Sequence, residues 1–210
     1  MLSEPPRGSS FQAKLGGKMP TNKFSDDPQT TWLTEVGPDR NMMLLEDFYF
    51  WDRQSVPWKA AKGLKTDGTS IPRALWTLIG SPFTGDYRRA ALVHDQACDD
   101  DGGDAQKRAA ADRMFFEACR AGGCSVWDAT VLYLGVRVGA AWDLDLLDNE
   151  GPRLTHTATD NQIQQDFQDI AAQILKHDLV DDAAVLEKRT DEAMRTVNEQ
   201  RAAARHVRPS

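Results

Sequence analysis

Two segments with helical periodicity, joined by a link of turn residues, constrain the fold of this chain most strongly. In residues 87–98, four residues recur at helical spacing and share one face: Tyr87, Ala91, His94 and Cys98. The second segment, residues 109–119, has an apolar face that includes Asp112. The link at residues 99–104 is rich in aspartate and glycine, and Asp104 is placed to cap the second helix. We therefore predict a short antiparallel hairpin of two helices.

The lengths of these segments predict that His94 and Asp112 lie level with each other. Counted from the glycines in the link, His94 comes eight or nine residues before the turn and Asp112 nine or ten after it. At about 1.5 Å of rise per residue, both lie roughly 13–14 Å from the turn. A histidine that faces a carboxylate suits proton transfer, because the carboxylate fixes the tautomer and stabilises the imidazolium. A structural hydrogen bond in a helix interface is the alternative interpretation.

Asp95 follows His94 directly and points about 100° away from it, where it is placed to hold a cation. This pattern resembles the catalytic helix pair of the phospholipase A2 superfamily, in which an adjacent His-Asp and an Asp of the antiparallel helix form the site. The resemblance implies His94 as general base, Asp95 as calcium ligand and Asp112 as orienting carboxylate. The paired cysteines of the secreted animal enzymes and a plain Gly-rich calcium loop are missing from this sequence.

A longer set of motifs resembles domain-of-unknown-function family 1353, which is frequent in phages, prophages and bacterial genomes. The motifs are Thr66-Asp-Gly-Thr-Ser-Ile-Pro-Arg73, Trp76, Gly80-Ser-Pro-Phe-Thr-Gly85, Tyr87, Ala90-Ala91, His94-Asp95 and Ala111-Asp112. They lie within residues 55–140. This resemblance implies a fold family and a site, but no established reaction.

Polar residues gather just before the first helix of the hairpin. The candidate site wall comprises Asp67, Ser70, Arg73 and Tyr87. Ser70 is also a candidate N-cap, and Pro72 fits the first turn of a short helix over residues 73–79, so the segment has a purely structural interpretation as well. Ser70 is a further candidate as the nucleophile of a serine triad, although its surroundings lack the strained Gly-x-Ser-x-Gly turn.

Strand-like runs precede the helices, and further helices follow them. The runs at residues 30–36, 41–51, 56–60 and 63–66 predict a small antiparallel sheet. A third helix is predicted over residues 125–142, where the apolar stripe indicates core. The predicted fold class is α+β, with a small antiparallel sheet packed beside a helical core. The predicted division is a mobile N-terminal arm at 1–28, a core domain at 29–150 and a helical C-terminal appendage at 151–210.

The appendage carries two predicted helices whose apolar stripes are too thin to form a core by themselves. We therefore expect residues 155–210 to be buried against the core or against another chain. A homo-oligomer, or a phage or secretion partner, is the corresponding expectation for binding. The net charge of −7 argues against non-specific binding of nucleic acid, which depends on basic surfaces.

The lack of recognisable targeting signals and the cysteine usage predict a chain that is cytoplasmic as synthesised. No apolar run approaches the roughly 18 residues of a transmembrane helix, and the N-terminus lacks the apolar core of a signal peptide. Packaging in a virion or non-classical export is the alternative. The three cysteines form no disulfide framework, so reduced thiols are expected, and Cys119 and Cys124 are placed to approach each other across Gly122-Gly123.

Two classes of function follow from these observations. The first is a hydrolase that resembles phospholipase A2, in which His94 activates water for hydrolysis of an ester in a lipid or membrane-surface substrate. The second is a non-enzymatic phage or prophage protein with a structural or interaction role, in which the histidine and the aspartate only pack. A hydrolase of another substrate, such as cell-wall material, is a further alternative.

The calcium role of Asp95 gives a direct prediction. If Asp95 is a ligand, saturating calcium raises the free energy of unfolding by mass action, by about 2.7 kcal/mol at 100 times the Kd. Thermal melts in calcium and in EDTA measure this shift, and Asp95→Ala should remove it. Equal melting temperatures for the natural protein in millimolar calcium and in EDTA would contradict the assignment.

Overall fold

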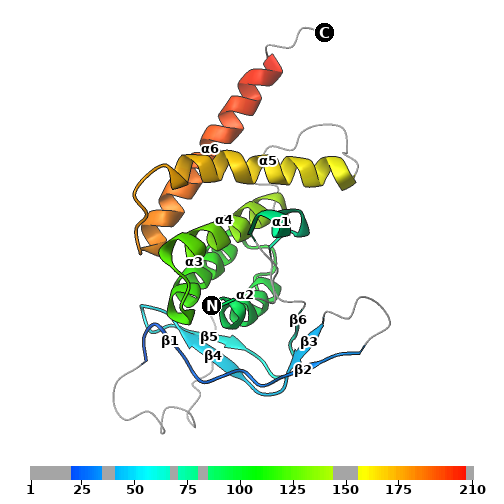
Figure 1. The fold of residues 1–210 in the computed structure, drawn as a ribbon, viewed down its shortest axis with the longest axis vertical. Helices are drawn as coiled ribbons and strands as arrows, with labels where there is room; N and C mark the ends of the chain where they lie inside the picture. The colour runs from blue at the N-terminus through cyan, green and yellow to red at the C-terminus, as the bar shows by residue number, and fades with distance from the viewer. Residues whose placement is uncertain (1–19, 35–40, 67–70, 80–84, 144–155, 207–210) are drawn as a thin grey trace, which may run out of the picture.

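The computed structural model describes residues 20–34, 41–66, 71–79, 85–143 and 156–206. These residues form three tiers: short strands at one end, a group of helices in the middle, and two long helices at the other end (Figure 1). The architecture is α+β, as predicted. Asp67 and Ser70 of the predicted site wall lie outside the described residues, as does the side chain of Arg73.

The strands of the described chain form two antiparallel sheets of three strands each. One sheet has the order β1-β4-β5, with β1 at Lys23–Phe24, β4 at Phe48–Trp51 and β5 at Pro57–Ala60. The other has the order β2-β3-β6, with β2 at Thr30–Trp32, β3 at Met42–Leu44 and β6 at Lys65–Thr66. The single sheet that we predicted is therefore divided into two.

The prediction of one strand across residues 41–51 is wrong at its centre. The chain turns at residues 45–47 and passes from β3 in one sheet to β4 in the other. Asp47 stabilises this turn, because its carboxylate accepts a hydrogen bond from the Lys62 backbone N–H at 2.9 Å and pairs with Lys59 at 2.7 Å. Apolar periodicity alone does not indicate such a break, since the side chains on both sides of it are largely apolar.

The described part of the predicted N-terminal arm is joined to the first sheet. β1 pairs with β4, and Phe24 is buried against Phe48, with 5.6 Å between the ring centroids. The Arg89 guanidinium lies over the Phe24 ring, 4.7 Å from its centre. Residues 20–28 thus contribute to the wall that faces the helices.

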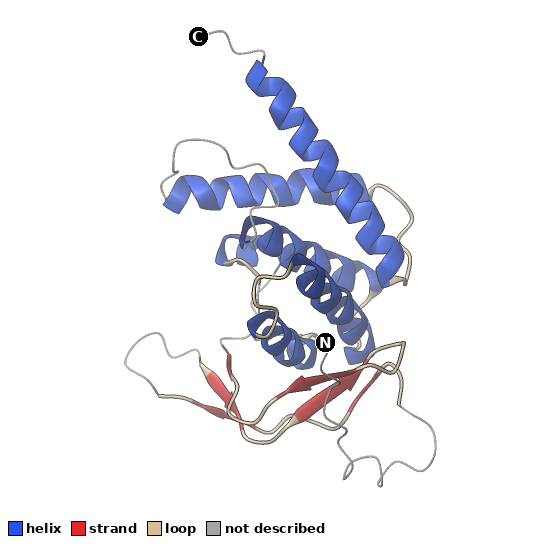
Figure 2. Cartoon of the chain, turned by 180° about the vertical axis from the view of Figure 1, so that it is seen from behind, coloured by secondary structure: helices blue, strands red, loops and turns tan. Residues whose placement is uncertain are grey.

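The helices form the middle and upper tiers. They are the 3-10 helix η2 (Arg73–Leu75), α1 (Trp76–Ile79), α2 (Arg88–Asp99), α3 (Ala105–Gly122), α4 (Val126–Asp143), α5 (His156–Leu175) and α6 (Ala183–His206). The predicted hairpin is confirmed as α2 and α3, which pack along each other (Figure 2). Asp104 caps α3 by accepting from the backbone N–H groups of Gln106 at 2.8 Å and Lys107 at 3.2 Å. Ser125 caps α4 in the same way, through the Asp128 N–H at 3.0 Å.

The C-terminal end of α3 fixes how the hairpin closes. The backbone N–H groups of Gly123 and Cys124 donate to the carbonyls of Arg120 and Cys119, and Gly123 has φ 115°, so the helix ends in a Schellman motif. Gly122 lies against the chain that leads into α2: a Cβ there would stand 2.4 Å from the Asp86 carbonyl oxygen. The two helices can approach this closely only with glycine at residue 122.

The two C-terminal helices bury their apolar faces within the chain. The buried residues are Ile163, Phe167, Ile170 and Ile174 of α5 and Leu186, Met194 and Val197 of α6. α5 packs on α4, and α6 packs on α5 and α3. Arg113 of α3 pairs with Glu187 of α6 at 2.5 Å, and Arg53, which follows β4, pairs with Asp181 of the link between α5 and α6 at 2.8 Å. Within the described part of the chain, none of the helices combines the length and apolarity needed to span a bilayer.

The close approach at Gly122 predicts a strong effect of a small substitution. Gly122→Ala should destabilise the fold by about 1–3 kcal/mol despite the better helix propensity of alanine, because backbone must move to admit the methyl group. Gly135→Ala in α4 is the matched control, since the one close contact of its Cβ would be the movable end of the Ile79 side chain at 2.7 Å, with Ile71 at an ordinary 3.5 Å. Urea denaturation measures both, and a smaller loss at residue 122 than at residue 135 would contradict the packing argument.

Candidate active site

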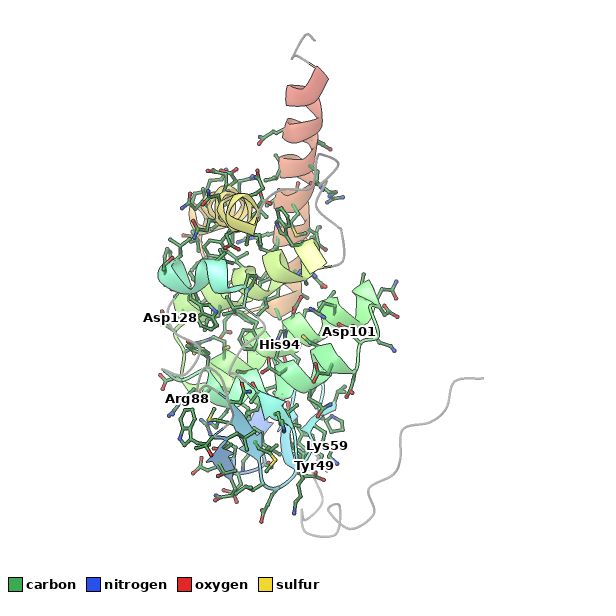
Figure 3. The ribbon with its side chains drawn as sticks, turned by 90° about the vertical axis from the view of Figure 1, so that its right-hand side faces the viewer. Tyr49, Lys59, Arg88, His94, Asp101 and Asp128 are labelled. Carbon is green, nitrogen blue, oxygen red and sulfur yellow. The ribbon has the colours of Figure 1, made fainter. Side chains whose placement is uncertain are left out.

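The predicted contact between His94 and Asp112 is present. His94 Nε2 lies 2.8 Å from Asp112 Oδ1, and the two side chains are 1% and 0% exposed. Because a carboxylate only accepts hydrogen bonds, Nε2 carries the shared proton and Nδ1 is left for another partner. The Phe115 ring packs against the imidazole, with 4.7 Å between the centroids. We call His94 and Asp112 the His–Asp pair. Figure 3 shows His94 inside the layer of helices, with Tyr49 and Lys59 of the sheet on one side.

Arg137 of α4 is a third member of the site that we did not predict. Its Nη1 lies 3.3 Å from Asp112 Oδ2, and its Nη2 lies 2.9 Å from Oδ1 of Asp191 in α6. The prediction of core concerned the apolar stripe of this helix, and Arg137 lies outside that stripe. A signal was present in the sequence, because Arg137 is the charged residue in the otherwise apolar run at 131–142. Such a residue is rarely buried unless it is paired.

Two buried polar atoms near Asp112 have no hydrogen-bond partner among the described residues. They are the Tyr133 hydroxyl and Arg137 Nε. Burial raises the pKa of Tyr133 far above its ordinary value, so the hydroxyl remains a donor at neutral pH. Buried donors of this kind are usually satisfied by water or by a small polar ligand. The interior next to the His–Asp pair therefore retains unused hydrogen-bonding capacity.

The charge of the His–Asp pair follows from two opposing effects on His94. Burial lowers the pKa of His94, because it penalises the imidazolium, but the hydrogen bond to Asp112 and the contact with Cys98 raise it from 6.5 to about 10. Cys98, one helical turn further along α2, has its Sγ 3.7 Å from Nδ1 and 3.6 Å from Nε2. His94 is therefore an imidazolium at neutral pH, buried between a carboxylate and a thiol.

Asp95 lies on the neighbouring face of α2. Its Oδ2 accepts a hydrogen bond from Thr66 Oγ1 of β6. The described residues bring no group of three His, Cys, Asp or Glu side chains together in a way that could hold a metal ion. Residues 67–70 and 80–84, from which we expected carbonyl ligands, lie outside the described residues. The calcium role of Asp95 stays a prediction.

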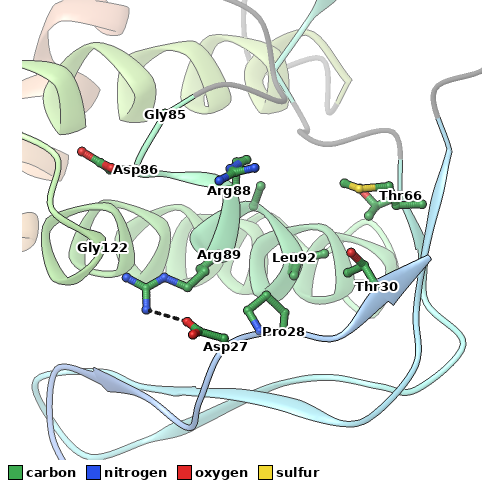
Figure 4. A pocket seen from close by; sticks show the side chains of 12 residues that line it. Asp27, Pro28, Thr30, Thr66, Gly85, Asp86, Arg88, Arg89, Leu92 and Gly122 are labelled. Atoms are coloured by element: carbon green, nitrogen blue, oxygen red, sulfur yellow. Dashed lines mark ion pairs between the residues drawn. The ribbon is translucent and has the colours of Figure 1, made fainter. Parts of the chain in front are cut away.

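A cavity of about 410 Å³ opens beside the start of α2 (Figure 4). Its lining includes Thr30, Thr66, Arg88, Arg89, Ala91 and Leu92. An ion pair at 3.9 Å joins Arg89 to Asp27 on one wall. Thr66 belongs to both this cavity and the Asp95 contact, so the cavity adjoins the site. Tyr87, the described member of the predicted site wall, is buried at the start of α2 and packs beside Gly85.

Comparisons with known proteins find a similarity to one family and name no activity. A family model described as Protein of unknown function (DUF1353) matches residues 42–136. The matched range contains the His–Asp pair and Asp95, and Arg137 follows it directly. No solved structure matches this chain significantly. The comparisons name neither phospholipase A2 nor a phage protein.

Two curated relatives come from Sinorhizobium fredii (strain NBRC 101917 / NGR234). Uncharacterized protein y4jT is 34% identical over 125 residues, which are 58% of this chain and 35% of that protein. Uncharacterized protein y4iH is 43% identical over 68 residues, which are 32% of this chain and 28% of that protein. This chain thus spans about a third of the length of the curated relatives that it matches.

The raised pKa of His94 predicts how stability depends on pH. A group whose pKa is higher in the folded state adds stability below its unfolded value of 6.5, and this stability is lost as the pH rises through about 10. Asp112→Asn removes the stabilising carboxylate and should cost about 3–5 kcal/mol at pH 6, because a buried partner is left unpaired. The difference between the two proteins should shrink as the pH approaches 10.

Urea denaturation of the natural protein and of Asp112→Asn between pH 6 and 10 measures this difference. Asp104→Asn is the matched control, because asparagine caps a helix as well as aspartate does and residue 104 is exposed. A gap between natural protein and Asp112→Asn that is the same at every pH would show that the pair does not titrate as proposed.

Proposed function

We propose that this protein is a hydrolase that cleaves ester bonds, with the His–Asp pair as its proton-transfer centre. The observation that carries the proposal is the 2.8 Å contact between His94 Nε2 and Asp112 Oδ1. It fixes the tautomer, orients the imidazole and leaves Nδ1 for a reacting group, as a general acid–base catalyst requires. Arg137 supports the arrangement by holding the second oxygen of Asp112.

The cost of burying these groups favours a functional role over a purely structural one. His94, Asp112 and Arg137 are all nearly inaccessible to solvent, and each loses hydration on folding. Replacing a buried ion cluster with apolar residues of similar volume is often neutral or stabilising, by up to about 4 kcal/mol. A site selected only for stability therefore has little need of this cluster, and perturbed titratable groups gather at functional sites.

The protonation state of His94 determines whether it first donates or first accepts a proton. With a pKa of about 10, His94 donates a proton at neutral pH and accepts one only after it has lost its own. Direct activation of water by His94 would therefore increase with pH up to about 10. A lipid ester is the substrate class that the resemblance to phospholipase A2 suggests, and the adjoining cavity offers apolar side chains and two arginines to an amphiphilic molecule. No step in this scheme needs calcium.

A second function is favoured by one specific observation. His94 is 1% exposed, which is also what a structural ion pair requires. In that case the protein is a non-enzymatic interaction protein of a phage or prophage. Its exposed tryptophans, Trp32 at 60% and Trp127 at 52%, would then be the first side chains to test for contact with a partner.

The two functions differ in how variants of the His–Asp pair behave. We expect the natural protein to hydrolyse p-nitrophenyl butyrate, and His94→Gln to reduce the rate about 10²–10⁴-fold. His177→Gln is the matched control, because residue 177 is exposed and distant in sequence. Circular dichroism must show that both variants are folded. Absence of hydrolysis by the natural protein, or equal rates for the two variants, would rule out the hydrolase.

A further inference from the structure

The burial of the His–Asp pair leaves a problem that Cys98 solves. A side chain that is 1% exposed cannot by itself reach the carbonyl of a bulky ester. Cys98 lies one turn after His94 on α2, so the two side chains share a helix face. Its Sγ is within 3.7 Å of both imidazole nitrogens, and the residue is only partly buried. Cys98 is thus the partly exposed member of this group.

Two cationic side chains lie near Cys98. The imidazolium of His94 is in contact with the sulfur, and the Arg108 guanidinium interacts with it from α3. Asp101 holds Arg108 in place through an ion pair at the hairpin turn. Cysteines that act as nucleophiles are found partly exposed and next to a histidine, as Cys98 is.

We propose that Cys98 is the nucleophile of this site, with His94 as its acid–base partner and Asp112 as the positioning residue. For its reaction this inference rests on the ester hydrolase proposed above, whereas activation of the thiol by His94 is open to a separate test. The arrangement is a nucleophile, a base and an orienting carboxylate in contact series, which is the pattern that activates a weak nucleophile. Sequence periodicity places Cys98 on this face, although Ser70 was the candidate nucleophile that the sequence suggested.

The reaction balances without a metal or a redox partner. The Cys98 thiolate attacks the ester carbonyl carbon, the carbon–oxygen bond to the alcohol breaks, and the alcohol leaves with the proton of the His94 imidazolium. An acyl thioester on Cys98 and a neutral imidazole result. Water then attacks the thioester carbonyl and gives a proton to His94, and the carbon–sulfur bond breaks to release the acid. The thiolate and imidazolium are restored, and the sum is ester plus water to acid plus alcohol.

Alkylation at a fixed pH tests the activated thiol alone. Iodoacetamide at pH 7, in EDTA so that no bound cation contributes, should modify Cys98 before the other two cysteines. In the His94→Gln variant, the rate of alkylation of Cys98 should fall about tenfold or more. Trypsin separates the three cysteines into the peptides 90–107, 114–120 and 121–137, so each is followed by mass. Cys119 and Cys124 are buried and report unfolding of a variant. Equal alkylation of Cys98 in His94→Gln and His177→Gln overturns the proposal.

Acyl trapping on the unaltered protein makes the test independent of whether variants fold. With p-nitrophenyl butyrate we expect a burst of p-nitrophenol and a butyryl group on peptide 90–107, and Cys98→Ala should lose both. If Cys98→Ala hydrolyses the ester at the natural rate, the cysteine proposal is wrong and the hydrolase stands. If the ester is never hydrolysed but alkylation of Cys98 depends on His94, the hydrolase is wrong and the activated thiol stands.

Discussion

The buried hydrogen bond between His94 and Asp112 is the interaction on which the arrangement of the helices depends. It joins α2 to α3 in the protein interior, and the second oxygen of Asp112 passes the contact to Arg137 of α4. Arg137 in turn reaches Asp191 of α6. Four helices therefore meet in one chain of alternating charges. Because buried ions are stable only when paired, loss of any inner member leaves its neighbours uncompensated, at a cost of about 3–5 kcal/mol.

This network crosses the predicted domain boundary at residue 151. The C-terminal helices were predicted as an appendage, and Asp191 of α6 holds the guanidinium that contacts Asp112. α5 and α6 also bury their apolar faces on the middle tier. Removal of residues 152–210 would expose α4 and leave Arg137 with one carboxylate instead of two. The geometry of the His–Asp pair is thus supported from a helix far away in the sequence.

Electrostatics and accessibility together indicate what the site can do. A histidine with a pKa of about 10 is a poor base for water at neutral pH, but it is a suitable partner for a thiolate and a suitable acid for a leaving group. Cys98 is in contact with that imidazole and partly open to solvent. The high pKa of His94 thus makes direct activation of water slow at neutral pH, and together with the contact to Cys98 it favours the proposed attack by the cysteine.

Local patterns in the sequence determined the elements with short-range causes. Helical spacing placed His94 level with Asp112, and capping chemistry at Asp104 marked where α3 begins, because hydrogen bonds and side-chain faces within one helix depend on neighbours a few residues away. Only the tertiary structure decided that Arg137 completes the site, that Cys98 contacts the imidazole, and that the chain changes sheet at residues 45–47. Each of these depends on how separate elements pack against one another or on which rotamer a shared interior allows, and sequence periodicity carries no information about either.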